Sequence, residues 1–301
     1  MNDTIQPHLN LTTPQQPLTS HLSPEQFTAL WQKCTTNNPS VFTRYLSTLS
    51  PLKPSPADLN HCLSTALSYG PHYAVMQHLI TQHNVPVSGN MLVDAVQMAI
   101  PISEKTTLLD FLLDEGGWDI NAQVNGWNTL LNYATKDVEL VKYLLNRGAN
   151  PNLGPVVGVA VSMYGASQLV ANSGAVLATA VREGNREVVD MLVQQGAVLA
   201  NASAVHCAVE KGDEAMLVRV LGLGADVDEK DTFAVFGTRT VGTPLVRAVR
   251  ENKVNMVTVL LKNGASVREK GRGGLSVVEM VKMGWVDDYI RKAVEAWAKE
   301  D

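Results

Sequence analysis

Histidine and cysteine are the residues of this chain most able to bind a metal or attack a substrate. Cys34, Cys62 and Cys207 lie far apart at irregular spacing, which fits neither a disulfide framework nor a zinc site. His72 and His78 are six positions apart on or beside one predicted helix, and this spacing does not place both rings on the same helix face. The sequence therefore predicts no metal site, no cofactor and no catalytic residue, and it predicts buried, apolar roles for the cysteines.

Two further patterns could support chemistry. The paired carboxylates Asp114-Glu115 and Asp287-Asp288 could serve as general acids and bases, but they fall at helix ends or on polar faces, where charge is usually solvated. The segment Gly271–Gly274 is rich in glycine, yet it lacks the preceding strand and the following Lys-Ser/Thr of a phosphate loop. These residues favour a noncatalytic protein, although they leave an enzyme possible.

Composition narrows the class of protein further. The 301 residues are 45% hydrophobic without a clear linker, which favours one continuous folded body. A net charge of -5 without a cluster of basic residues argues against direct nucleic-acid binding. Without a secretory signal or an apolar run of about 18 residues, no membrane association is expected. An odd number of cysteines suggests a reducing compartment, so we expect the cytoplasm or nucleus.

A short pattern recurs along the second half of the chain. An apolar helix face ends each time in a glycine followed by alanine, because glycine adopts the left-handed conformation that caps a helix. The segments are Leu144–Ala149, Leu192–Ala197, Leu221–Ala225 and Leu260–Ala265.

A second alanine precedes three of these glycines, at Ala180, Ala208 and Ala248. Tight turns such as Glu183–Asn185 follow it, so each unit contains a short helix, a turn, a longer helix and a glycine cap. Neither helix could bury its apolar face alone, and the units must therefore stack on one another.

These residues resemble the ankyrin repeat, whose usual length is about 33 residues. Thr243-Pro244-Leu245-Val246-Arg247-Ala248 is similar to its Thr-Pro-Leu-His-x-Ala start and departs at the histidine position. The resemblance implies an all-α, ankyrin-type solenoid with short β-hairpin-like loops and helical caps at both ends. It also implies a structural role for His206, with hydrogen bonds to backbone near the turn.

The sequence predicts four segments. Ser23, Pro24 and Gln26 form the start of a capped helix, which begins an N-terminal helical cap. The third repeat, at about 124–154, is two residues short near Lys136-Asp137. The predicted segments are a disordered tail at 1–20, the cap at 21–57, about six ankyrin-like repeats at 58–270 and a C-terminal capping repeat at 271–301.

Two spacings between successive glycine caps exceed the usual repeat and predict long loops near 155–172 and 230–242. The first is apolar and uncharged, and the second alternates apolar residues with threonine, which suggests a hairpin. Because exposed apolar surface is costly, the loops either fold back on the repeats or bind a ligand. In the second case Met163, Tyr164, Phe233, Phe236 and Arg239 line the site.

The resemblance also indicates which first-helix residues face the concave side of the array. Aromatic and arginine side chains among them are typical interface anchors, and Arg182, Arg247 and Arg250 could together meet a carboxylate or an acidic segment of a partner. The residues indicated on this face are Tyr133, Thr179, Arg182, Cys207, Glu210, Arg247 and Arg250, and Trp127, at the start of the third repeat, is a further candidate for partner binding.

The preferred function is a noncatalytic protein-binding adaptor or regulator that uses this concave face and the two long loops. Its partner is another protein of unknown identity. An alternative is a small-molecule-binding auxiliary enzyme of a biosynthetic pathway, whose pocket for a small apolar ligand lies in the notch between the loops.

Overall fold

In a computed structural model, the chain folds into two compact units. The first comprises Met1–Ala95 with Thr107–Trp118, and the second comprises Val96–Thr106 with Asp119–Asp301. The boundary passes through two helices, α5 (Gly89–Gln97) and α6 (Ile102–Asp114). The residues that the structure describes are 15–126, 128–155, 169–200, 202–230, 242–271 and 274–298.

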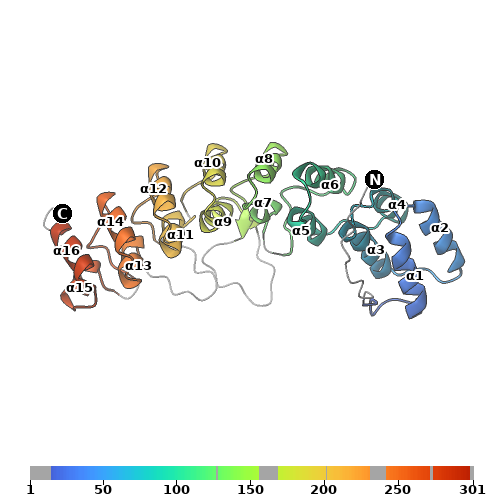
Figure 1. The fold of residues 1–301 in the computed structure, drawn as a ribbon, viewed down its shortest axis with the longest axis horizontal. Helices are drawn as coiled ribbons and strands as arrows, with labels where there is room; N and C mark the ends of the chain where they lie inside the picture. Colours follow the sequence, from blue (N-terminus) through green and yellow to red (C-terminus); the bar gives the residue numbers. More distant parts are fainter. Residues whose placement is uncertain are drawn as a thin grey trace, which may run out of the picture. The chain divides into compact units, whose positions relative to one another are not determined.

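Two helical hairpins make up most of the first unit. α1 packs against α3 and α2 packs against α4, as Figure 1 shows at the blue end of the ribbon. Phe27, Leu30 and Phe42 are fully or almost fully buried in this unit. The apolar face of each hairpin is therefore covered by the other. The helices are α1 (Pro24–Cys34), α2 (Pro39–Thr48), α3 (Pro56–Ser68) and α4 (Tyr73–His83).

The start of α1 follows from local sequence. The Gln26 backbone N–H donates to Ser23 Oγ at 3.2 Å, and the Ser23 N–H donates to Gln26 Oε1 at 2.8 Å, which confirms the predicted capping box. Within the predicted N-terminal tail, Pro17–Ser20 form a turn, and the Gln16 side chain donates to the Leu22 carbonyl at 2.7 Å. This contact places them beside the start of α1. Residues 1–14 lie outside the described part.

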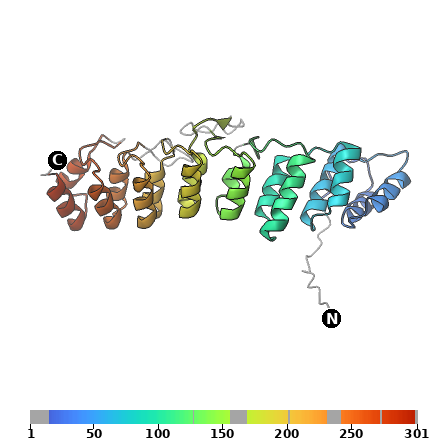
Figure 2. The ribbon, with the colours of Figure 1, turned by 90° about the horizontal axis from the view of Figure 1, so that it is seen from above.

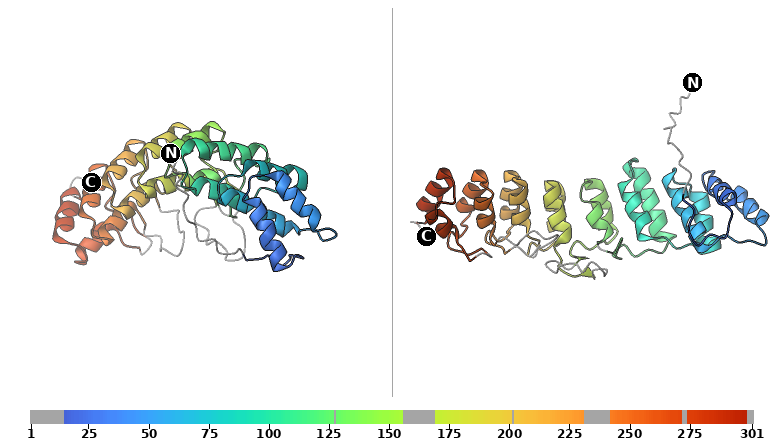
Figure 3. Two further views of the ribbon diagram at one scale, coloured as in Figure 1. Left: turned by 45° about the vertical axis from the view of Figure 1, so that its right-hand side comes forward. Right: turned by 90° about the horizontal axis from the view of Figure 1, so that it is seen from below.

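The second unit repeats the helical hairpin from α7 to α16. α9 packs against α11 and α11 against α13, while α12 packs against α14, so first helices lie beside first helices and second beside second. Figure 2 and Figure 3 show these hairpins side by side from green to red. The helices are α7 (Leu130–Tyr133), α8 (Val138–Asn146), α9 (Ala175–Glu183), α10 (Arg186–Gln194), α11 (Ala204–Lys211), α12 (Glu214–Gly222), α13 (Pro244–Arg250), α14 (Val254–Lys262), α15 (Val277–Lys282) and α16 (Asp288–Trp297).

Glycine ends the second helix of four successive hairpins, as the recurring pattern predicts. Gly148, Gly196, Gly224 and Gly264 have φ of +89°, +84°, +96° and +84°. This left-handed conformation lets the next residue bond back to the helix; the Ala197 N–H, for example, donates to the Leu192 carbonyl at 2.8 Å. The predicted all-α stack of hairpins is confirmed.

The missing residues of the third repeat shorten its first helix. α9 continues three residues beyond Ala180, whereas α7 ends one residue before the equivalent Ala134. Asp137 then caps α8 through a bond from the Leu140 N–H at 3.1 Å. The sequence predicts the deletion correctly but places it in the turn, and the helix itself is cut because the following N-cap is retained.

The loops between hairpins are joined by side-chain amides and carboxylates. Asn152 Nδ2 donates to the Gly196 carbonyl at 2.8 Å, and Asn152 Oδ1 accepts from the Val198 N–H at 2.8 Å. Asn121 makes both equivalent bonds to the next loop, and Asp228 accepts from its next loop. Each of these contacts connects two neighbouring repeats at the loop edge.

The first long loop leaves the array through a short β-ribbon. β1 (Gly154–Pro155) pairs antiparallel with β2 (Leu169–Val170), and isolated bridges join Val124 to Asn128 and Lys270 to Ser276. These pairs confirm the hairpin-like loops. Residues 156–168 of the first loop, and the predicted hairpin within 231–241 of the second, lie outside the described residues. In the described part, no helix is long and apolar enough to cross a membrane.

Candidate partner-binding site

The first helices of the second unit carry one predicted side chain each, just before the repeated alanine. Tyr133 lies on α7, Thr179 on α9, Cys207 on α11 and Arg247 on α13. Asn132 Nδ2 donates to Thr179 Oγ1 at 3.2 Å and so joins α7 to α9 along this line. Cys207 is buried, whereas the other three are partly exposed. We call this the first-helix face.

A network of charges fills the first-helix face between α11 and α13. Arg247 Nη2 lies 3.3 Å from Glu210 Oε2, and Arg247 Nε donates to Glu251 Oε1 at 2.9 Å. The Arg247 side chain is 12% exposed, so both pairs are partly shielded from water. The structure thus brings together two predicted residues, Glu210 and Arg247, and adds Glu251, which the sequence reasoning missed.

Lys253 completes the network from the start of α14. Its Nζ donates to the Val209 carbonyl at 2.8 Å and the Glu210 carbonyl at 2.6 Å, and it lies 2.6 Å from Glu251 Oε2. These three acceptors match the three N–H groups of an ammonium. Burial by itself raises the pKa of Glu251, but the hydrogen bonds from Lys253 and Arg247 outweigh it and leave the pKa lowered.

The three predicted arginines do not share one site. Arg182 is half-buried on α9 and Arg250 is exposed at the end of α13, and α11 packs between these two helices. The charge of Arg247 is balanced by two carboxylates of the chain itself. A partner carboxylate therefore cannot meet all three guanidinium groups at once.

A pocket of about 480 Å³ lies where α7 ends early. Tyr133 and Thr179 line it, together with the end of α5 and the turn before α8. At the rim of the pocket, Oε2 of Glu183, the last residue of the longer α9, lies 3.5 Å from Lys136 Nζ. The pocket therefore lies at the end of the shortened first helix of the third repeat.

Lys105, at the start of α6, belongs to the lining of this pocket and is only 8% exposed. Its Nζ donates to the Val96 carbonyl at 2.9 Å. The sequence reasoning missed Lys105, but a signal was present: it precedes Leu108, Leu109 and Leu112 at helical spacing, so it occupies an apolar-stripe position. All residues that line the pocket belong to the second unit.

Two sequence patterns of one family match the second unit. An ankyrin repeat pattern matches residues 125–154, and a pattern of three ankyrin repeat copies matches residues 177–271. The chain carries ankyrin repeats. The matched ranges contain the hairpin of α7 and α8 and the helices from α10 to α14, which carry most of the first-helix face.

Similar ankyrin-repeat proteins include the B-cell lymphoma 3 protein homolog of Mus musculus. It is 30% identical over 96 residues, which are 32% of this chain and 20% of that protein. The chain thus matches only about a fifth of that relative. The crystal structure of the ankyrin repeat domain of Bcl-3, described as a unique member of the IkappaB protein family, superposes with a TM-score of 0.51. The two are 21% identical, over 68% of this chain and 84% of that one, so they share the fold.

Several predicted site residues lie outside the described part of the ankyrin repeats. They are Trp127, Met163, Tyr164, Phe233, Phe236 and Arg239. Just before the second long loop, a hollow of about 340 Å³ is lined by residues that include Leu199, Asp226, Glu229 and Lys230.

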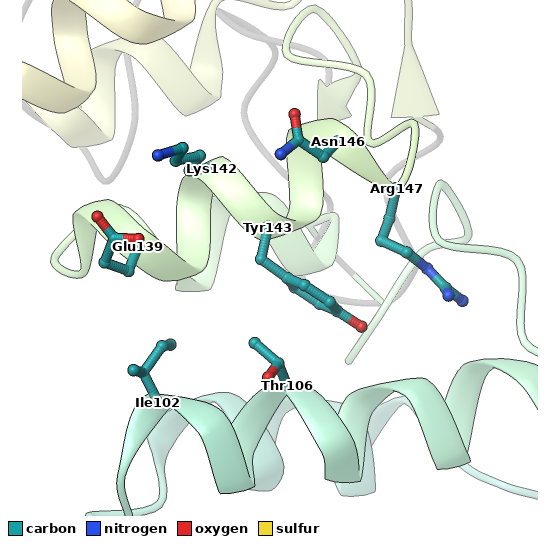
Figure 4. A pocket seen from close by; sticks show the side chains of 7 residues that line it. All are labelled: Ile102, Thr106, Glu139, Lys142, Tyr143, Asn146 and Arg147. Atoms are coloured by element: carbon teal, nitrogen blue, oxygen red, sulfur yellow. The ribbon is translucent and has the colours of Figure 1, made fainter.

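Another hollow of about 330 Å³ lies between the start of α6 and the length of α8 (Figure 4). The Tyr143 ring points from α8 toward Thr106, while Lys142 and Asn146 extend from the other side of α8. Glu139, Lys142, Asn146 and Arg147 are exposed. This hollow is therefore an open part of the second-helix surface.

Among the residues that the structure describes, no three His, Cys, Asp or Glu side chains could hold a metal ion. A hydrogen bond with Cys34, followed by burial, raises the pKa of the Cys62 thiol well above its usual value, so it is a poor nucleophile. His206 Nε2 lies 3.1 Å from the Glu229 carbonyl, which fits the structural role that the resemblance implies.

Proposed function

We propose that this chain is a noncatalytic, protein-binding adaptor or regulator of the cytoplasm or nucleus. Its partner is another protein, which contacts the first-helix face and the two long loops near 155–172 and 230–242. The first-helix face corresponds to the concave side in ankyrin-repeat proteins. Repeat arrays of this kind bind through such extended surfaces.

One observation carries the proposal. Consecutive first helices lie side by side and present different polar and aromatic groups: Tyr133 on α7 and Thr179 on α9 are partly exposed, and Arg250 on α13 is exposed. The backbone of a packed array fixes the spacing of these groups, so a partner meets a rigid, chemically varied surface. Tyrosine and arginine are among the residues that contribute most to binding at interfaces.

The similar proteins support the protein-binding part of the proposal. The ankyrin repeats of this chain are similar in sequence to part of the mouse B-cell lymphoma 3 protein homolog, and they share the fold of a domain from the IkappaB protein family. Neither likeness names the partner of this chain. The partner must therefore be sought by experiment.

The proposal is tested by capturing partners from the native host with the full chain and repeating the capture with surface variants. Tyr133→Ala and Arg250→Glu change the first-helix face. Val218→Glu, at a side chain 53% exposed on α12, changes the second-helix surface and serves as the control. We expect the first two variants to lose the partner and the control to retain it, with all three melting within a few degrees of the wild type.

The contribution of the second loop needs a separate variant. Replacing Phe233 and Phe236 by Ala is expected to weaken capture without changing the melting temperature. Capture that survives all first-helix and loop variants but is lost in Val218→Glu contradicts the proposal, because the partner then binds the opposite surface.

A further inference from the structure

Lys105 is a buried cation with few partners. Its single hydrogen bond among the described residues goes to the Val96 carbonyl, and no carboxylate of that part lies within ion-pair distance. An ammonium has three N–H groups, so two remain for other acceptors. Burying a charge is costly unless it is paired, and this side chain is only 8% exposed.

Lys253, at a different position in its repeat, shows how a lysine can be fully paired at the end of a first helix. Lys253 also donates to carbonyls at the end of a first helix, but it uses all three N–H groups and one acceptor is the Glu251 carboxylate. Lys105 holds one carbonyl at the end of α5 and lacks a carboxylate. If capping the helix were its whole role, the single bond would not explain a charge in this position.

The pocket provides the place for the missing acceptor. Its other charged lining residues are Lys136, Asp137 and Glu183. Lys136 and Glu183 pair with each other at the rim, and Asp137 accepts the Leu140 N–H as the cap of α8. Of the two lysines that line the pocket, Lys136 therefore has a carboxylate partner and Lys105 has none among the described residues.

We propose that this pocket is a carboxylate site that receives an Asp or Glu side chain of the partner protein, with Lys105 as its ion-pair partner. Tyr133 and Thr179 place the pocket at the start of the first-helix face, so the occupant is a segment of a protein that also contacts this face. A carboxylate forms charge-assisted hydrogen bonds with an ammonium, and these strengthen when water is excluded. This inference rests on the proposed function and specifies the partner chemistry.

Selection from a random peptide library displayed on phage tests the inference with the full chain. Binders are selected on the wild type and depleted on Lys105→Met, and the best is synthesised with its acidic residue and with the amide in its place. We expect the selected peptides to share one Asp or Glu. The acidic peptide should lose about tenfold or more in affinity on Lys105→Met, and the amide peptide should bind both proteins equally weakly.

One further variant of Lys105 and one control variant complete the test. Lys105→Gln can keep a hydrogen bond to Val96 while removing the charge, and it replaces Lys105→Met if the latter does not fold. Lys142→Met removes an exposed lysine of the same unit and should leave the affinity unchanged. Both folded variants should melt close to the wild type.

Other outcomes overturn the inference in different ways. Selected peptides without a shared acid, or with affinity unchanged by both Lys105 variants, show that Lys105 is only a helix cap. If Tyr133→Ala still abolishes their binding, the proposed function stands while this inference fails. Binding of free glutarate as tight as that of the peptide shows a small-molecule site instead.

Discussion

A lysine bonds to the end of two first helices in this array, but the two lysines differ in how many partners they have. At the end of α11, Lys253 reaches two carbonyls and Glu251, and Glu251 also holds Arg247. At the end of α5, Lys105 reaches one carbonyl beside a pocket of about 480 Å³. In the first region all three N–H groups of Lys253 bond within the chain. In the second region two N–H groups of Lys105 remain for acceptors of another molecule.

This difference separates a structural use of charge from a functional one. A fully paired cluster contributes to stability and has little to offer a partner, because binding must first break its bonds. A buried cation with unused donors contributes less to folding and gains more from a ligand. Substitutions in the two regions should therefore differ in their effects on stability.

The largest expected loss of stability follows substitution of Lys253, the lysine whose three N–H groups all have acceptors in the chain. Lys253→Met leaves the Val209 and Glu210 carbonyls without this donor and should lower the unfolding free energy by about 1–3 kcal/mol. Lys105→Met loses one bond but removes a buried charge, and it should leave stability unchanged or raised. Urea unfolding followed by circular dichroism compares the two. If Lys105→Met lowers the unfolding free energy more than Lys253→Met does, Lys105 has the larger structural role and the comparison is contradicted.

The loop edge offers a second pair of positions, one bonded and one not. Asn152→Ala removes two bonds to the next loop, at Gly196 and Val198, and should cost about 1–2 kcal/mol. Asn152→Asp keeps an acceptor for the Val198 N–H and should lose less. Thermal melting of both variants checks the order, and equal losses contradict a role for the bond that Asn152 Oδ1 accepts from the Val198 N–H.

The equivalent of Asn152 in the next repeat is Ala200, which can make neither bond. Ala200→Asn should bond to the Gly224 carbonyl and the Asp226 N–H and raise stability by about 0.5–1 kcal/mol. Ala200→Gln has the same amide on a longer side chain and is the matched control. The melting temperature should rise only for Asn, whereas a rise in both variants points to a general effect of a polar side chain.

The smallest expected effect is the pH dependence of the satisfied cluster. Because the folded pKa of Glu251 is lowered, its contribution is present above its ordinary pKa of 4.5 and is lost as pH falls through the folded value. Glu251→Gln should cost on the order of 0.5 kcal/mol at pH 7, and this difference from the wild type should shrink in acid. Urea midpoints from pH 7 to pH 3.5 measure it, and a constant difference excludes the ion pairs as its cause.

Local sequence predicts much of this fold. The glycine caps at Gly148 and Gly196 and the capping box at Ser23 depend on residues a few positions apart, so the sequence is sufficient to place them. The first-helix positions of Tyr133 and Arg247 follow from the repeat register. The resemblance to ankyrin repeats adds which face these residues occupy.

The candidate site was harder to predict, because it depends on contacts between repeats. Glu251 is visible as a partner of Arg247 at helical spacing, but Glu210 joins them only through the packing of α11 on α13. The deletion near Lys136 was visible in the sequence, yet its consequence was not. The pocket arises because α7 ends early while Lys105 approaches from α6, and neither fact alone indicates a pocket.

Hydrogen–deuterium exchange of the full chain, with and without its captured partner, tests the central claim most directly. We predict that binding slows exchange in α7, α9 and α13 and in the turn at Thr135–Asp137, and leaves α8, α10 and α12 unchanged. Protection confined to α8, α10 and α12 would contradict a binding site on the first-helix face.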